Sequence, residues 1–241
     1  MIREHFEFRQ TITTILADSN ADIEAAKSGI LKARMAVESA VSADPFLLST
    51  FEPYDPGFDH PVIQRMVAAG SAAGVGPMAA VAGTIAWAGV EAMADAGARF
   101  GVVDNGGDIA LFSDRPIRIG IYAGDLRNRA FLLPPQERIS GVCTSSATVG
   151  PSISFGSADA VTVFSPDVSV ADAYATALCN RLSPGDYSAL SDLEGSPITG
   201  VLALFGEEMV VRGEVPDIVQ AEVDTDLITR GLPAIPRLPR T

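Results

Sequence analysis

The segment Asn105-Gly106-Gly107-Asp108-Ile109-Ala110 joins two apolar runs of strand length. The first run covers Phe100 to Val103, and the second covers Ile109 to Phe112. Glycine tolerates positive φ, and Asn and Asp favour tight turns. The segment therefore predicts a β-hairpin. A functional interpretation is also open, since two glycines would let a flat or phosphorylated ligand touch the backbone beside Asp108.

A second motif, Ala171-Asp172-Ala173-Tyr174-Ala175-Thr176-Ala177, lies on a predicted helix from Val168 to Leu182. Asp172 and Thr176 are four residues apart, so both side chains lie on one face of that helix, about 6 Å from each other. Hard cations such as Mg²⁺ prefer these oxygen ligands, supplemented by backbone carbonyls and phosphate. Alternatively, Asp172 favours the positive end of the helix and Thr176 packs.

Together, in this order, the two motifs resemble the ApbE superfamily, whose best-known members are Mg²⁺-dependent flavin transferases. The resemblance covers roughly residues 10 to 210. It implies an α+β, ApbE-like fold related to the T-fold, with a mixed or antiparallel sheet packed by helices. T-fold proteins often bind flat rings such as pterins and purines.

The resemblance also implies site residues. A flavin nucleotide, FAD or FMN, would lie at the first motif and at Thr144-Ser145-Ser146, which resembles a T-S-G segment of the family. The implied contacts are Asn105, Gly106, Gly107, Asp108, Thr144, Ser145 and Ser146. Mg²⁺ would be held by Asp172 and Thr176. The family transfers FMN from FAD to a protein Thr or Ser.

The chain departs from the family pattern in two places. The family has a K-G-Y triplet, but no lysine or tyrosine occurs between Gly74 and Gly89 here. The family also has a His-containing segment and a D-P-x-T-G-like run, where this chain has Gly150 to Gly156 without histidine or acid. No catalytic residue can be assigned, and the layout resembles a conserved-hypothetical branch without an assigned activity. Asp159 follows that loop and is a candidate second acidic group.

Composition limits the partners. The chain has 241 residues, is 47% hydrophobic and carries a formal charge of −13. This is enough apolar sequence for one large domain, residues 1–241. An acidic surface repels nucleic acid and anionic membranes. A polyphosphate ligand would therefore need local positive potential from a bound cation or from helix N-termini, such as the one that Gly74 to Pro77 opens.

Targeting signals are not evident in the sequence. Met1 to Gln10 lacks the apolar region of a signal peptide, and two cysteines make no disulfide framework. The apolar stretch from Ala72 to Val90 has the length of a membrane span but is rich in Gly and Ala, so we expect a buried helix. The expected location is the cytoplasm. Cys143 is expected to be structural or to line a ligand, since a reactive thiolate needs a nearby base.

The remaining elements follow from periodicity and turn residues. Residues 2–16 alternate as strands, and Ser19 to Asp22 begins a helix that runs to about Val41. Further helices are expected at residues 62–72 and 78–97, and further strands at 117–122, 139–144, 160–164, 198–205 and 208–212. The Pro-rich tail, about residues 232–241, is expected to be an extended arm. Such an arm often orders against a partner, which favours a homo-oligomer.

Three hypotheses about function remain open. The first is a flavin nucleotide binder with Mg²⁺, with or without FMN transfer. The second is a binder or enzyme for another ring, such as a pterin, without a metal requirement. The third is a non-catalytic protein that retains the fold. A dependence of ligand binding on Mg²⁺ separates the first from the second.

Overall fold

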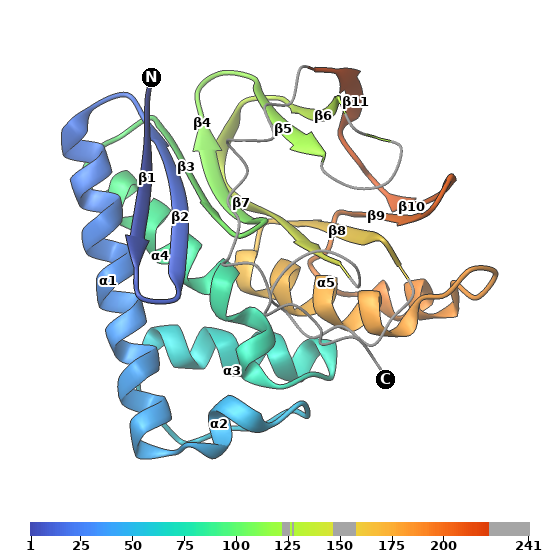
Figure 1. Ribbon diagram of the computed structural model, residues 1–241, viewed down its shortest axis with the longest axis horizontal. Coiled ribbons are helices and arrows are strands. Elements are labelled where there is room, and N and C mark those ends of the chain that lie inside the picture. The colour runs from blue at the N-terminus through green and yellow to red at the C-terminus, as the bar shows by residue number, and fades with distance from the viewer. Residues whose placement is uncertain (122–125, 127, 147–157, 222–241) are drawn as a thin grey trace, which may run out of the picture.

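The computed structural model describes residues 1–121, 126, 128–146 and 158–221. Its elements form an α+β fold, as the sequence predicts (Figure 1). The strands are β1 Ile2–Phe8, β2 Thr11–Ala17, β3 Phe100–Asn105, β4 Asp108–Ser113, β5 Ile117–Ile121, β6 Arg129–Leu133, β7 Gln136–Ser145, β8 Ala160–Ser165, β9 Gly200–Phe205, β10 Glu208–Gly213 and β11 Asp217–Gln220. The helices are α1 Asn20–Ala43, α2 Phe46–Ser49, α3 Pro61–Ala73, η1 Pro77–Ala80, α4 Val81–Asp95, α5 Val168–Arg181 and η3 Ser188–Leu193.

Two antiparallel sheets build the molecule. Eight strands pair in the order β1-β2-β3-β4-β7-β8-β9-β10, and three strands form a smaller sheet in the order β11-β6-β5. Each pair of neighbouring strands in the large sheet is antiparallel, so the expected antiparallel sheet is confirmed. Helices α1, α4 and α5 pack on one face of the large sheet, and the small sheet lies on the other side (Figure 1).

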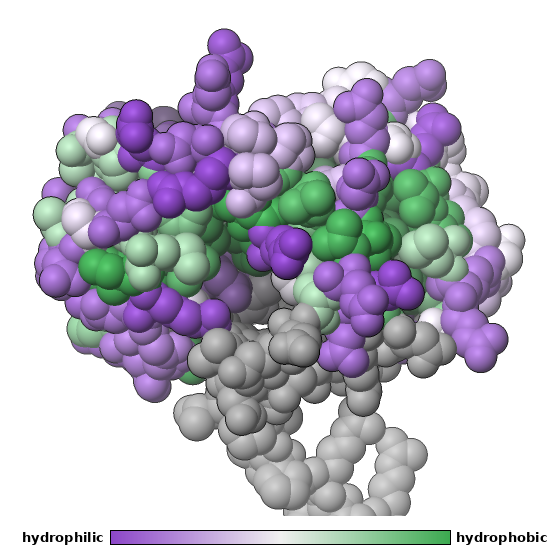
Figure 2. All heavy atoms as spheres, turned by 90° about the horizontal axis from the view of Figure 1, so that it is seen from above, coloured by the Kyte–Doolittle hydropathy of each residue, from purple (hydrophilic) through white to green (hydrophobic). Residues whose placement is uncertain are grey.

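Successive side chains of β3 and β4 point alternately to the two faces of the large sheet. Val103, Ala110 and Phe112 belong to the core under the helices. Phe100, Val102, Ile109 and Leu111 belong to a second core, which they share with residues of the small sheet such as Phe131. Seen from above, apolar side chains gather at the centre and right of the surface, on the side of the small sheet, with hydrophilic side chains around them (Figure 2). The strands are apolar on both faces because both faces are covered.

The first helix begins where the sequence predicts. The Ser19 hydroxyl accepts a hydrogen bond from the Asp22 amide at 3.2 Å, and the Asp22 carboxylate accepts from the Ser19 amide at 3.1 Å. This capping box satisfies two amides that helix geometry leaves free. The helix ends at Asp44, directly before Pro45, because a residue before proline is disfavoured in the helical region.

Helix α4 is the central helix. It packs against α1, α5, β3 and β4. A Cβ atom added at Gly29 of α1 would lie 2.3 Å from the Ala88 carbonyl oxygen, so glycine sets the distance between α1 and α4. The segment Pro77–Asp95 is long and apolar enough to cross a membrane by length and composition, but 50% of its most apolar window is buried within the fold. The expected buried helix is therefore observed.

Several elements differ from the sequence-based expectation. The small sheet is the main difference, because only β5 is expected from the sequence, whereas β6 and β11 are short strands beside Pro134 and Pro216. The helix expected over residues 78–97 begins instead as the 3₁₀ turn η1, with Pro77 at its first position, and becomes α-helical at Val81. The predicted arm at residues 232–241 lies outside the described residues.

Candidate functional site

The glycine turn between β3 and β4 is held against β7. Gly106 and Gly107 have φ of 73° and 105°, which confirms the tight turn. The Gly107 amide donates to Asp104 Oδ1 at 2.9 Å, and the Gly107 carbonyl accepts from the Thr144 amide at 3.2 Å. The turn is therefore fixed at both of its backbone groups, which places Asp108 at the start of β4.

Asp108 points toward the helices. It pairs with Cys143 across β4 and β7, and alternation puts it on the same face as Ala110. The Cys143 thiol is fully buried and donates to the Val168 carbonyl, at a distance of 3.6 Å between sulfur and oxygen. Val168 is the first residue of α5, so this face of β7 lies directly against the beginning of that helix.

Asp172 lies on α5 and caps a different helix. Its side chain is 6% exposed, and its Oδ2 accepts from the Gly83 amide at 2.7 Å. Gly83 lies in the first turn of α4, where amides lack partners within the helix, so Asp172 acts as a capping carboxylate supplied from α5. A Cβ atom at Gly83 would lie 2.9 Å from the Asp172 Cβ, which explains why a glycine occupies this position.

The first turn of α4 joins the two sequence motifs. The Asn105 side-chain amide donates to the Ala82 carbonyl at 3.0 Å, and the next residue, Gly83, donates to Asp172. Directly after Gly83, the Thr84 hydroxyl lies 2.8 Å from that of Ser169. The structure therefore brings Asn105 and Asp172 together at Ala82 and Gly83.

The carboxyl groups of Asp108 and Asp172 both have pKa values above the usual value for aspartate. Burial raises the pKa of Asp172 from 3.8 to about 7, although the amides of Gly83 and Ala82 act in the opposite direction. Burial also raises the pKa of Asp108 well above its usual value, and the charges of Asp172 and Asp104 raise it further. Neither Asp108 nor Asp172 forms an ion pair with another described residue. Two acids near enough for one charge to act on the other therefore have no ion-pair partner among the described residues.

Cys143 is a neutral neighbour of this acid pair. Burial raises the pKa of its thiol well above the usual value, and the charges of Asp108 and Asp172 add to that shift. A thiolate would be required for nucleophilic attack. The structure therefore favours the expected structural or lining role, in which the thiol donates hydrogen bonds.

The other predicted residues lie at the end of β7 and on α5. Thr144 contributes its amide to the glycine turn, but its hydroxyl lies on the opposite face of the sheet, 2.9 Å from that of Thr162. Ser145 is buried in β7. The Ser146 hydroxyl donates to the Asp159 carbonyl at 2.6 Å. Thr176 is half-buried, one helical turn beyond Asp172.

Asp159 and the turn before η1 both form hydrogen bonds within the fold. The Asp159 carboxylate accepts from the Gly206 amide at 2.6 Å, so it braces the turn between β9 and β10. The Val75 and Gly76 amides donate to the carbonyls of Gly70 and Phe51, so neither amide is free to bind a phosphate. The predicted loop from Gly150 to Gly156 lies outside the described residues.

Sequence reasoning missed Ala82 and Gly83. The Ala- and Gly-rich composition of this helix indicates close backbone approach, but it does not show which helix approaches or that the contact holds Asp172. The hydrogen bond between Gly83 and Asp172 joins residues 89 positions apart. A glycine in the first turn of a helix is the one local signal that could have been used.

The donors fit a hard divalent cation. The described residues hold no cluster of three His, Cys, Asp or Glu side chains suited to a metal ion. Mg²⁺, however, is often bound by one or two carboxylates and completed by water and substrate phosphates. Asp108 and Asp172 supply such carboxylates, and a cation between them would relieve their mutual repulsion.

Replacing Gly107 by alanine tests how much the turn depends on glycine. An added Cβ would lie 3.7 Å from the Thr144 carbonyl oxygen, an ordinary contact, but φ of 105° is strained for any L side chain. We expect Gly107→Ala to lower the free energy of unfolding by about 1–3 kcal/mol in urea titrations. Gly106→Asn is the matched control and should cost less, because φ there is 73° and Asn tolerates the left-handed region. Equal losses would show that φ at Gly107 is not limiting.

Comparison with solved structures finds the same fold. The chain superimposes on the apo flavinyl transferase ApbE of Pseudomonas stutzeri with a TM-score of 0.52 and 14% identity, covering 96% of this chain and 98% of that one. Flavin transferase ApbE of Vibrio cholerae gives a TM-score of 0.54 and 14% identity, covering 89% and 96%. At this identity the likeness shows the fold alone, which is ApbE-like.

Sequence comparison finds much nearer relatives. The UPF0280 protein of Methanoculleus marisnigri is 63% identical over 234 residues, 96% of each chain. The UPF0280 protein of Methanosphaerula palustris is 58% identical over 234 residues, covering 96% of this chain and 99% of that protein. Residues 3–213 match the family described as AbpE bacteria. This chain therefore belongs to that family, together with the UPF0280 proteins, and has the ApbE-like fold that its two motifs predicted.

Proposed function

We propose that this chain binds a flavin nucleotide, or a related heterocycle carrying phosphate, together with a divalent cation. The observation that carries the proposal is the pair of half-buried Asp108 and buried Asp172, which has no ion-pair partner among the described residues. In a protein of net charge −13, two neighbouring acids without an ion-pair partner are costly to keep ionised unless a cation neutralises them. The fold shared with ApbE flavin transferases supports the choice of ligand.

Asp108 and Asp172 would hold the cation from two sides. The glycine turn fixes the backbone before Asp108, and the Gly83 amide holds the Asp172 carboxylate, so the Asp172 side of the site is already oriented when a ligand arrives. The Thr176 hydroxyl lies one turn along α5 and is the remaining predicted donor. When bound, Mg²⁺ would screen ligand phosphates from the two carboxylates.

The turn and the first residues of α4 would orient the ligand. A Cβ atom added at Gly106 would have no described atom within 4 Å, so a flat ring can approach the backbone there. Asn105 is held by the Ala82 carbonyl and cannot swing into the ligand's place without losing that hydrogen bond. Binding at this turn would then depend on Mg²⁺, because without the cation the acid pair repels phosphate.

Thermal unfolding with candidate ligands tests the proposal. FAD, FMN, ADP and a pterin are each added with MgCl₂ and with EDTA, to the wild type and to Asp172→Asn. A ligand at 100 times its Kd stabilises a protein by about 2.7 kcal/mol, which such a measurement resolves. We expect a shift with FAD or FMN that needs Mg²⁺ and is lost in Asp172→Asn. Asp217→Asn, on the exposed strand β11, is the control for loss of one charge and should behave as wild type.

Other results would overturn the proposal in distinct ways. A shift with the pterin that is the same in EDTA would favour a ring binder without a metal. No shift with any ligand would leave the relation to flavin transferases as one of fold. If a flavin binds as proposed, incubation with FAD and mass spectrometry of added protein acceptors would test FMN transfer.

A further inference from the structure

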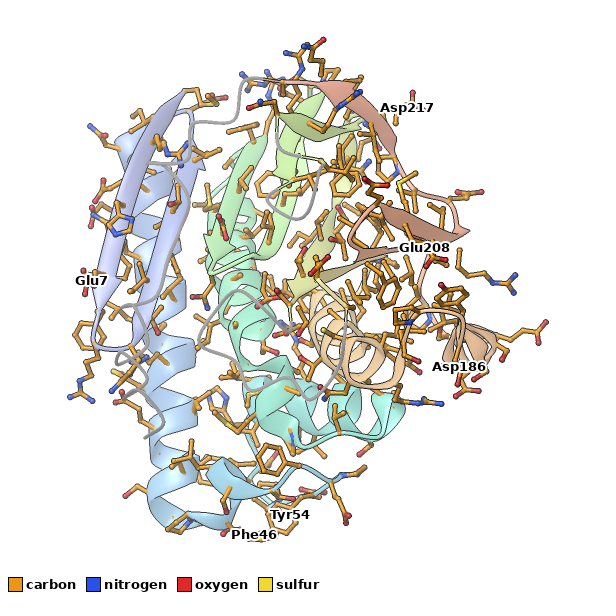
Figure 3. The ribbon with its side chains drawn as sticks, turned by 45° about the vertical axis from the view of Figure 1, so that its right-hand side comes forward. Glu7, Phe46, Tyr54, Asp186, Glu208 and Asp217 are labelled. Carbon is orange, nitrogen blue, oxygen red and sulfur yellow. The ribbon has the colours of Figure 1, made fainter. Side chains whose placement is uncertain are left out.

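Strand β10 is the last strand of the large sheet, and in the described part of the chain its outer edge is unpaired. It pairs with β9, from Glu208 opposite Phe205 to Gly213 opposite Gly200, and no other described strand pairs with it. The register runs without a bulge, and the strand contains no proline or lysine. Figure 3 shows Glu208 at this rim of the molecule. An edge without such protection is a ready template for another strand.

The hydrogen-bond pattern shows which residues of β10 face outward. The Leu204 carbonyl of β9 accepts from the Asp159 amide, so Leu204 faces β8 and its neighbours in β9 face β10. The Glu214 amide donates to the Thr199 carbonyl, which places the even-numbered residues of β10 toward β9. The amides and carbonyls of Met209 and Val211 therefore point away from the sheet.

Side chains at this edge are apolar on one face. Met209 and Val211 are 51% and 49% exposed, and they lie on the face of Leu204 and Leu202, which belong to the core under the small sheet. The opposite edge strand, β1, differs because its exposed face carries Arg3, His5 and Glu7. Charged side chains of that kind are a common protection against edge pairing. The apolar side chains at β10 would lose water contact if a second strand were added.

The charges on β10 are complementary to those on a second, antiparallel copy of β10. We infer that two copies of this chain form a dimer by antiparallel pairing of β10 with β10, centred on Val210. In this register Glu208 lies opposite Arg212 of the second copy, and Met209 lies opposite Val211, twice by symmetry. Arg212 forms no ion pair with the described residues of its own chain.

The neighbouring register with its axis through Val211 is less favourable. When the two-fold axis passes through Val210, the outward amide and carbonyl of Met209 lie opposite those of Val211 in the second copy. Both residues then exchange backbone hydrogen bonds with that copy. An axis through Val211 also satisfies outward groups, but it places Glu208 opposite Glu214, and like charges directly opposite are destabilising. The inference rests on the sheet edge and is independent of the proposed ligand site.

Mass in solution is the first test. Light scattering or sedimentation equilibrium of the full chain should give twice the mass of 25.1 kDa. A monomer up to about 100 µM, well above the Kd of a micromolar interface, would overturn the inference. If the natural partner of this edge is a different protein, the purified chain alone would be a monomer, and this result would overturn the inference.

Charge exchange tests the predicted ion pairs. Arg212→Glu places two glutamates opposite each other and should weaken dimerisation at least about tenfold. The double variant with Glu208→Arg and Arg212→Glu restores opposite charges and should recover most of the affinity. Asp95→Arg, at the exposed end of α4, is the control for a change of charge outside the pairing. A dimer equally strong in all variants would place the interface elsewhere and overturn the inference.

Cysteine cross-linking tests the register. Directly opposite residues in a non-hydrogen-bonded pair have Cα atoms about 4.5 Å apart, within the range of a disulfide. Val210→Cys should therefore give a covalent dimer under mild oxidation, and Val211→Cys, which lies opposite Met209, should give much less. The native Cys143 and Cys179 are fully buried and should not compete. Equal cross-linking at both positions, or at neither in a dimeric protein, would contradict the register.

Discussion

Replacing Asp172 by asparagine is expected to stabilise the protein when neither cation nor ligand is present. The folded state raises the pKa of this carboxyl from 3.8 to about 7, so keeping it ionised in the fold costs roughly 4 kcal/mol at most. Asparagine removes the charge and retains an oxygen that can accept from the Gly83 amide. We expect Asp172→Asn to raise the melting temperature by roughly 5–10 °C at about pH 8 in EDTA.

The effect should depend on pH with a definite sign. Above pH 7 the carboxyl is ionised in both the folded and the unfolded protein, and the full cost is present. As the pH falls from about 7 toward 3.8, the folded protein takes up a proton before the unfolded one does, so wild-type stability rises relative to the variant. The advantage of Asp172→Asn should therefore shrink strongly by about pH 5.

Asp172→Ala separates charge from capping. It removes the charge but also leaves the Gly83 amide without an acceptor, which costs about 1 kcal/mol. It should therefore be less stable than Asp172→Asn at every pH. If Asp172→Asn instead lowers stability at about pH 8 in EDTA, Asp172 is a structural cap without electrostatic cost, and the argument for a cation fails.

Gly29→Ala is expected to lower the free energy of unfolding more than any other single methyl group added to the helices. The new Cβ would lie 2.3 Å from the Ala88 carbonyl oxygen and 2.9 Å from the Ala92 Cβ, and backbone cannot move aside as a flexible side chain can. Helices α1 and α4 would have to separate. Overpacking of this kind costs about 1–3 kcal/mol and occasionally more. We expect a loss of about 3 kcal/mol in urea unfolding despite the better helix propensity of alanine.

Ser28→Ala is the matched control for Gly29→Ala. Ser28 is the preceding residue of α1 and is exposed, so the same added helix propensity meets no neighbour. Its stability should stay within about 0.5 kcal/mol of wild type. A loss at Gly29 no larger than at Ser28 would show that the contact between α1 and α4 adapts easily. The position of α4, and with it Gly83, would then be less fixed than described.

Local sequence patterns are sufficient for the elements that carry the site. Two glycines between apolar runs predict the turn beside Asp108, and on the helix expected from Val168 to Leu182 the spacing of Asp172 and Thr176 puts both on one face. The capping box at Ser19 and the break at Pro45 set the ends of α1. Each of these signals acts over a few residues, so one chain without an alignment is enough to find them.

Contacts between distant segments could not be predicted in the same way. Nothing near Gly83 in the sequence shows that its amide meets Asp172, and nothing near Thr144 shows that its hydroxyl turns to the other face of the sheet. The small sheet was missed because β6 and β11 gain their stability from pairing with each other and with β5. Such pairing depends on tertiary context rather than on local propensity.

Calorimetric titration of FAD into the protein tests the central claim most directly, with excess MgCl₂ in one experiment and EDTA in the other. We predict saturable binding with MgCl₂, a loss of at least about tenfold in affinity in EDTA, and a similar loss in Asp172→Asn with MgCl₂ present. Binding of equal strength in MgCl₂ and in EDTA, unchanged in Asp172→Asn, would contradict a cation site at Asp108 and Asp172.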